Sequence, residues 1–204
     1  MALTKIEASN IAAGAVASSG LNSVQTFTSG GAWTKPADVT KVIVEVQGAG
    51  GSGSAQAANY GSGGGGGFAK KLLDVSNTTT ATAAVGTGGA AKSANAGAGI
   101  AGGLSSFVEL SGTGGWTDVV GNGGAGHPGP ASVSAGGTAT GGDINIVGGI
   151  GELLSAAAGG NVYGAGAKKE VAAGQGYGGG GGHGYSSYAS GAGTNGIVIV
   201  WEFK

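Results

Sequence analysis

Glycine makes up 51 of the 204 residues of this chain, and its clusters lie between short segments that have the composition of β-strands. Collagen is excluded because no strict three-residue repeat runs through the sequence, which contains 3 prolines. Disordered chains normally stay in water through their charges, whereas 9% of these residues are charged and the net charge is −1. The sequence therefore predicts that the glycine is packed in an ordered structure.

Ordered glycine is unfavourable, because each residue loses roughly 0.5–1 kcal/mol more backbone entropy than alanine does. Such a chain folds only if the missing side chains let segments of backbone approach one another closely. Glycine helices of the polyproline-II type meet this condition, since they stack side by side and hydrogen-bond to their neighbours. Two runs of five glycines, residues 63–67 and 178–182, are the predicted buried members of such a polyglycine-II bundle. Ordinary glycine loops are the alternative.

Alternating apolar residues predict strands at residues 41–47 and 197–203. Residues 197–203 (IVIVWEF) are apolar on both faces, which indicates a central strand or one that lies against another chain. Trp33 and Trp201 are assigned to the core, and a turn is expected at residues 33–36. Weaker strands are expected at residues 26–28, 68–75, 80–86, 105–110 and 143–147, and one or two helical turns at most at residues 152–158. The predicted fold is mainly β: a small β-sandwich from both ends of the domain, with a projecting glycine-rich region of polyglycine-II helices and loops.

Residues 1–24 differ in composition from the glycine-rich domain predicted at residues 25–204. Their apolar residues are too few for a core of their own, so we expect this segment to anchor the chain to its copies or to a larger assembly. A frayed terminus is the alternative. The residues expected to make this attachment are Leu3, Ile6, Ile11 and Val16. Because the sequence contains neither a membrane span nor the apolar core of a signal peptide, we expect synthesis in the cytoplasm without membrane insertion.

Motifs for catalysis, cofactors and metals give no usable signal. The chain has no cysteine, and neither His127 nor His183 has a neighbouring Asp or Glu, so no metal site is expected. A GxGxxG pattern at residues 48–53 is expected by chance at this glycine content, and no amphipathic helix follows it. With no arginine and no basic patch, nucleic-acid binding is not expected. The sequence predicts a protein that is not an enzyme and that uses no cofactor.

Aromatic side chains in the uncharged glycine-rich segments are the candidate binding residues, because tyrosine and tryptophan combine a large apolar face with a polar group. The predicted receptor-binding residues are Tyr60, Trp116, His127, Tyr163, Tyr185 and Tyr188. Tyr177 and His183 lie in segments of the same kind, and Tyr60, Tyr185 and Tyr188 are expected to be the most exposed. The alternative is that these rings only cover glycine layers or an interface between copies.

Four segments follow one another in the order AWTKPADVTKVIVEVQGAGGSG, GGGGGFAKKLLDV, GDINIVGG and GAGTNGIVIVWEF. Together they resemble the glycine-rich domain of bacteriophage tail fibres and adhesins, and the resemblance covers nearly everything after residue 25. It implies a virion protein, a tail fibre or fibre tip that binds a bacterial surface protein or polysaccharide and joins other virion proteins through its N-terminus. The two apolar faces of residues 197–203 further suggest a homotrimer.

Two other functions remain open from the sequence. One is a structural virion part, such as a capsid-decorating fibre or a tail connector without a host ligand. The other, more remote, is ice binding, although no regular face of threonines or alanines is visible.

Overall fold

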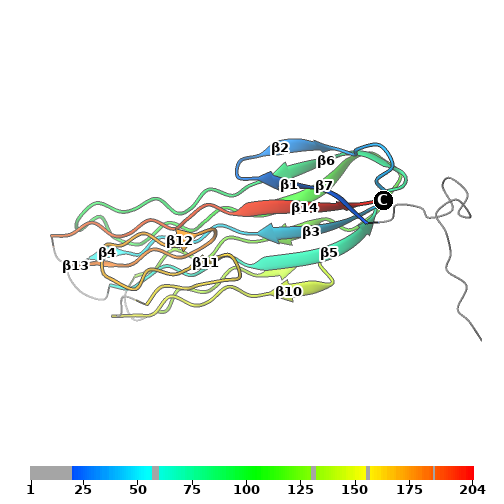
Figure 1. The fold of residues 1–204 in the computed structure, drawn as a ribbon. Helices are drawn as coiled ribbons and strands as arrows, with labels where there is room; N and C mark the ends of the chain where they lie inside the picture. Colours follow the sequence, from blue (N-terminus) through cyan, green and yellow to red (C-terminus); the bar gives the residue numbers. More distant parts are fainter. Residues whose placement is uncertain (1–19, 57–59, 130–131, 155–156, 186) are drawn as a thin grey trace, which may run out of the picture.

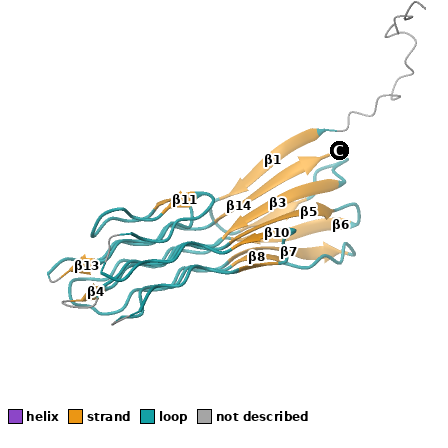
Figure 2. Ribbon diagram, turned by 90° about the horizontal axis from the view of Figure 1, so that it is seen from below, coloured by secondary structure: helices purple, strands orange, loops and turns teal. Residues whose placement is uncertain are grey.

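The computed structural model describes residues 20–204, apart from residues 57–59, 130–131, 155–156 and 186. Strands gather at one end of an elongated molecule, together with the C-terminus, and glycine-rich segments extend from them to the opposite end (Figure 1; Figure 2). Across these described ranges the fold is all β with no α-helix, which confirms the predicted mainly β class. No helical turn forms at residues 152–154, the N-terminal part of the segment where one or two turns were allowed. In the described part of the chain, no helix is therefore long and apolar enough to span a membrane.

The first sheet contains five antiparallel strands. In spatial order they are β1 (Leu21–Phe27), β14 (Ile197–Phe203), β3 (Lys41–Gln47), β5 (Phe68–Asp74) and β10 (Ile144–Ile146). Alternation places Val42, Val44 and Val46 of β3 on the inner face, where all three are fully buried. The bounds predicted for β3 and β14 are confirmed, and β14 is a central strand between β1 and β3.

The second sheet also contains five antiparallel strands and packs against the inner face of the first. Its strands are β2 (Gly31–Thr34), β6 (Thr78–Ala84), β7 (Ser105–Gly112), β8 (Val119–Gly121) and β9 (Ala139–Thr140). Its middle strands come from the middle of the chain, so the sandwich draws on more than the two ends of the domain. Glycine-rich excursions leave the sandwich between successive strands and return to it (Figure 1).

The core between the sheets contains two large rings and a buried carboxylate. Trp33 and Phe107 are fully buried and meet edge to face at a centroid distance of 5.7 Å. The indole N–H of Trp33 donates to Glu202 Oε1 at 2.7 Å, and Gln25 Nε2 donates to the same oxygen at 2.7 Å. Ser23 also donates to this carboxylate. These donors compensate the cost of burying Glu202.

Several sequence expectations need correction at the level of single residues. Trp33 lies within strand β2 and not in a turn, while Trp201 is half-buried on the outer face of the first sheet and not in the core. Strand β1 begins at Leu21, inside the segment assigned to the N-terminal anchor. The predicted attachment residues Leu3, Ile6, Ile11 and Val16 lie outside the described residues.

Glycine-rich rods, by which we mean the extended segments beyond the sandwich, hydrogen-bond sideways with a period of three residues. Along the rod of residues 48–55, the N–H groups of residues 48, 51 and 54 donate to carbonyls of residues 67, 64 and 61. Those of residues 49, 52 and 55 donate to residues 103, 100 and 97, and those of 50 and 53 to residues 194 and 191. Each rod is thus bonded to several neighbours at once, unlike a β-strand, which bonds to two.

The rod of residues 63–67 lies at the centre of this arrangement and is fully buried, as are residues 178–182, which confirms the burial predicted for both glycine runs. Its N–H groups donate to residues 181, 125, 149, 178 and 122 in turn. A Cβ on Gly63, Gly64 or Gly66 would lie 2.0–2.1 Å from a backbone oxygen of a neighbouring rod. Only glycine allows the rods to lie this close.

Candidate functional site at the distal end

Two short parallel strands lie at the end of the molecule opposite the sandwich (Figure 1; Figure 2). They are β4 (Ala55–Gln56) and β13 (Gly184–Tyr185), and Tyr185 pairs with Gln56. This pairing brings together residues that are more than 120 positions apart in the chain. We call Tyr60, His183 and Tyr185 the tip cluster.

The tip cluster is a packed set of rings with one exposed member. Tyr60 stacks on His183 at a centroid distance of 4.4 Å and an interplanar angle of 23°. Tyr185 meets Tyr60 edge to face at 4.9 Å. His183 is buried and Tyr60 half-buried, whereas Tyr185 is 46% exposed. The buried rings therefore fix the orientation of Tyr185. The Tyr188 N–H donates to the Tyr185 carbonyl at 3.1 Å, and the Tyr188 side chain is 63% exposed.

Backbone strain accompanies this cluster. Leu154 and Val171 both have a φ of 54°, which is unusual for large apolar residues and most of all for β-branched valine. The Leu154 N–H donates to the Tyr60 carbonyl and the Val171 N–H to the His183 carbonyl, both at 2.8 Å. The hydrogen bonds from these two strained residues thus hold the backbone of Tyr60 and His183 in place.

A negative charge lies beside the buried histidine. Glu170 Oε1 is 3.6 Å from His183 Nε2, and the Glu170 side chain is 63% exposed. The distal end therefore offers two exposed phenol rings and one carboxylate to a partner, a set suited to stacking and hydrogen bonding.

His127 lies next to this cluster but is fully buried. Its Nε2 is 2.8 Å from the Ser132 carbonyl oxygen, and the Gly129 N–H donates to Nδ1, so the ring is neutral with the proton on Nε2. Burial lowers the pKa of His127 by more than the Ser132 hydrogen bond raises it, and nearby His183 lowers it further. A Cβ on Gly61 would lie 2.2 Å from Nε2, so the ring fills the space beside this glycine.

Two of the predicted binding residues lie far from the tip cluster. Trp116 packs on the sandwich, where it stacks on Phe107 at 6.1 Å. Tyr163 packs edge to face on Phe68 at 5.8 Å, on the outer face of the first sheet. The structure thus brings Tyr60, Tyr185 and Tyr188 together with buried His127, and separates Trp116 and Tyr163 from them.

Tyr163 belongs to a polar network that joins a rod segment to the sheet. Its hydroxyl donates to Glu45, which also receives the Trp201 indole N–H at 3.2 Å and the Lys70 ammonium at 2.8 Å. Burial raises the pKa of the Glu45 carboxyl, but these three donors outweigh it and leave the pKa below its usual value. Burial and the bond to Glu45 raise the pKa of Tyr163. The network is fully engaged within the chain.

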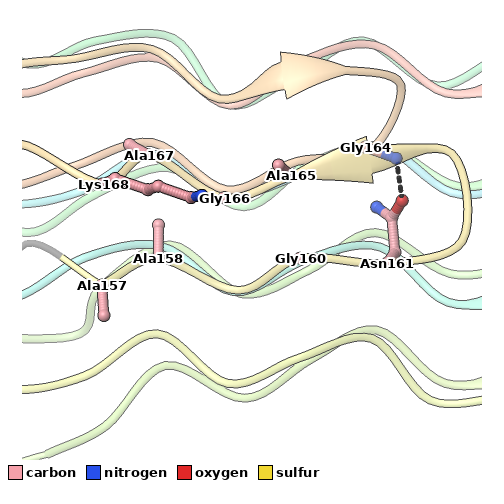
Figure 3. A pocket seen from close by; sticks show the side chains of 9 residues that line it. All are labelled: Ala157, Ala158, Gly160, Asn161, Gly164, Ala165, Gly166, Ala167 and Lys168. Atoms are coloured by element: carbon pink, nitrogen blue, oxygen red, sulfur yellow. Dashed lines mark hydrogen bonds between the residues drawn. The ribbon is translucent and has the colours of Figure 1, made fainter.

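A shallow groove of about 750 Å³ runs between the neighbouring segments 157–161 and 164–168 (Figure 3). Its walls are mostly alanine and glycine, with Lys168 at one side. The side-chain Oδ1 of Asn161 accepts hydrogen bonds from the N–H groups of Tyr163 and Gly164 at 3.0 and 2.7 Å, which closes the turn at one end of the groove. The groove is therefore a gap between two rods, and its lining residues include no group of side chains suited to catalysis.

His183, the ring on which Tyr60 rests, was grouped with the aromatic residues of the glycine-rich segments but was not one of the predicted receptor-binding residues. The signal available in the sequence was its position in GGHGY, two residues before Tyr185. Among the described residues, no group of three or more His, Asp or Glu side chains is placed to hold a metal ion. The arrangement supports recognition by surface contact.

The sequence matches a known protein family. The family model described as a glycine-rich domain matches residues 22–201, which is most of the chain and nearly all of the described structure. No curated protein matches the sequence.

Proposed function

We propose that this chain, which belongs to the glycine-rich domain family, is a bacteriophage virion fibre protein, a tail fibre or fibre tip that attaches the particle to the host surface. The observation that carries the proposal is the position of the tip cluster and of the nearby Tyr188: exposed Tyr185 and Tyr188 lie at the end of the rods, opposite the end where β1 and the C-terminus lie. Tyrosines held rigidly by buried neighbours bind with little loss of side-chain entropy.

We also propose that the glycine-rich rods are polyglycine-II helices. The three-residue period of their sideways hydrogen bonds supports this assignment, because a polyproline-II helix has three residues per turn and leaves its N–H groups free for neighbours. A bundle of this kind is a stiff support for a binding surface, since each rod is held by several others.

The remaining parts of the proposal concern assembly. The chain forms a homotrimer, and residues 1–24, with Leu3, Ile6, Ile11 and Val16, attach it to other virion proteins. The support for the place of attachment is geometric: β1 starts at the sandwich end, so a connection there leaves the tip cluster free. The partner at the tip is a bacterial surface protein or polysaccharide, bound without catalysis and without a cofactor.

A structural fibre without a host ligand is the second candidate. The observation that favours it is that Trp116 and Tyr163, two of the aromatic residues in glycine-rich segments, pack against the sandwich and not outward. Under this alternative Tyr185 and Tyr188 contact another virion protein.

Cell binding distinguishes the two functions. Fluorescently labelled full-length protein is titrated on a panel of bacterial strains, and the proposal expects saturable binding to at least one. Replacing both exposed tyrosines, Tyr185→Ala with Tyr188→Ala, is expected to weaken this binding by tenfold or more, since aromatic anchors at interfaces commonly contribute more than 1.4 kcal/mol each.

The matched control is Tyr177→Ala, which removes a half-buried tyrosine beside strand β12 (Gln175–Gly176), away from the distal end. It should leave binding unchanged. Equal binding by the double variant and the wild type on a responsive strain would remove the tip cluster from the proposal. Absence of saturable binding on every strain would favour the structural fibre.

A further inference from the structure

An apolar stripe lies along one long edge of the molecule. It consists of five large aliphatic side chains that are 43–62% exposed, namely Leu72, Ile144, Ile146, Val147 and Ile150. Val133 and Leu154, 53% and 59% exposed, continue it toward the distal end. Soluble monomers rarely expose so many large aliphatic side chains side by side, and such patches usually mark an interface.

The sheet register explains why these side chains gather. Ile144 pairs with Lys70 and Ile146 with Phe68, so both side chains lie on the outer face of the first sheet, the face that also carries Leu72. Val147 and Ile150 are three positions apart, one repeat of the rod pattern, and therefore share a side. The exposed aliphatic side chains thus extend from strand β10 onto the rod that follows it.

Strand β10 adds a second observation. It is the outermost strand of the first sheet, all three of its residues are exposed, and it pairs with β5 alone among the described strands. An exposed apolar edge strand invites pairing with another chain, and stable monomers usually blunt it with a charge or a proline. β10 carries neither.

Two charged side chains beside the stripe are engaged within the chain. The Lys70 ammonium is 2.8 Å from the Glu45 carboxylate, and the Asp143 carboxylate receives the Leu72 N–H at 2.9 Å. Glu152 is exposed between Ile150 and Leu154, near the distal end of the stripe. The rest of the stripe offers a partner apolar contact, as interfaces between identical chains commonly do.

The stripe is long enough for a subunit interface. Eleven residues from 144 to 154, at about 3.2 Å each, span roughly 35 Å. With the one neighbouring segment that borders it, the stripe is about 10 Å wide, which gives roughly 350 Å² in projection. Side-chain relief adds to this projected area, and a stable complex buries roughly 800 Å² per partner.

We propose that copies of this chain associate in parallel, edge to edge, through the apolar stripe. The course of the stripe along the long axis lets copies pack lengthwise, and the parallel arrangement is the one that aligns the sandwich ends of all copies and their tip clusters. The inference deepens the proposed homotrimer by naming its interface, and its parallel sense rests on the proposed fibre.

The first test measures the mass of the full chain by sedimentation equilibrium at micromolar concentration. The wild type should sediment at three times the chain mass of 18.8 kDa. The double variant Val147→Lys with Ile150→Lys should sediment as a single chain. The control Leu104→Lys, which changes a residue 53% exposed on a rod that does not border the stripe, should keep the wild-type mass. Circular dichroism verifies that each variant is folded.

The second test uses the absence of cysteine from the chain. Ile150→Cys should form a disulfide between chains under mild oxidation, because parallel copies bring the same residue of each chain to the shared edge. Leu104→Cys should not. A monomeric wild type, a lysine double variant that keeps its mass, or equal cross-linking by both cysteine variants would each overturn the proposal.

These results separate the interface from the proposed function. A parallel dimer that cross-links through Ile150→Cys supports the stripe but contradicts the homotrimer. Monomeric stripe variants should still bind cells, about 10²-fold more weakly because linked binding sites are lost. Tip variants should lose cell binding while keeping the wild-type mass.

Discussion

Replacing Gly64 with alanine tests whether the rods depend on backbone contact. Gly64 lies in the central rod, where its N–H donates to the Ala125 carbonyl at 2.9 Å. A Cβ at this position would lie 2.1 Å from the Ala135 carbonyl oxygen, whereas ordinary contacts begin at 3.4 Å. The rods of residues 63–67 and 134–137 must therefore separate by about 1.3 Å to admit one methyl group.

The free energy of this separation follows from the hydrogen bond that joins the two rods. The Gly137 N–H donates to Gly65 O at 2.8 Å. An increase of about 1.3 Å takes this bond beyond hydrogen-bond range. Its loss removes about 0.5–1.5 kcal/mol and leaves buried groups unpaired at a further penalty of about 1–3 kcal/mol. The lower entropy of unfolded alanine offsets about 0.4–1 kcal/mol, so we expect a destabilisation of about 0.5–4 kcal/mol.

Thermal unfolding followed by circular dichroism measures this effect. For a chain of this length, 1 kcal/mol corresponds to roughly 2–4 °C in Tm, so Gly64→Ala should lower Tm by roughly 1–16 °C. The matched control is Gly160→Ala, whose Cβ would meet its nearest neighbours at 3.4–3.8 Å. This variant should leave Tm unchanged or raise it slightly. Equal Tm values for the two variants would refute the argument that close rod contact requires glycine.

Two further predictions concern buried polar groups. The pKa of His127 is lowered in the folded protein, so the unfolded chain binds more protons near pH 5–6. The free energy that neutral His127 contributes to stability should therefore be complete above about pH 6.5 and fall as the pH decreases from there. Tm measured between pH 7.5 and 5 should show this decrease in the wild type and not in His127→Gln. Carboxyl groups with lowered pKa, such as Glu45, act at lower pH and do not account for it. Tyr163→Phe removes one hydrogen-bond donor from the Glu45 carboxylate. It should destabilise the protein by about 1–2 kcal/mol in urea unfolding and leave cell binding unchanged. Reduced cell binding at wild-type stability would instead place Tyr163 in the recognition surface.

The strands most visible in the sequence were those with regular alternation. Residues 41–47 and 197–203 have a period of two and long apolar runs, and both form strands with the predicted bounds. Strand β2 was missed because its four residues include a glycine and an alanine, so that Trp33 has no apolar partner two positions away. Its place is decided by pairing with β6 and by the core around Trp33, which are long-range contacts.

The candidate site was predictable only in part. Of the three tyrosines predicted to be most exposed, Tyr185 and Tyr188 are exposed, whereas Tyr60 is half-buried. Uncharged glycine neighbours leave a ring uncovered unless a distant segment packs on it, as one does at Tyr60. Such a segment does cover Trp116 and Tyr163, through Phe107 and the Glu45 network, and nothing local to either residue indicates this. The contact of Tyr60 with His183 depends likewise on the pairing of β4 with β13.

The three-residue period of the sideways hydrogen bonds limits how related chains can vary in length. Inserting one residue into a rod rotates every later N–H toward the wrong neighbour, whereas inserting three restores the pairing and extends that rod by about 9 Å. Adjacent rods must lengthen together to keep their partners. Natural variants of this domain should therefore differ by multiples of three residues in several glycine segments at once, and the distance from sandwich to tip should change in discrete steps.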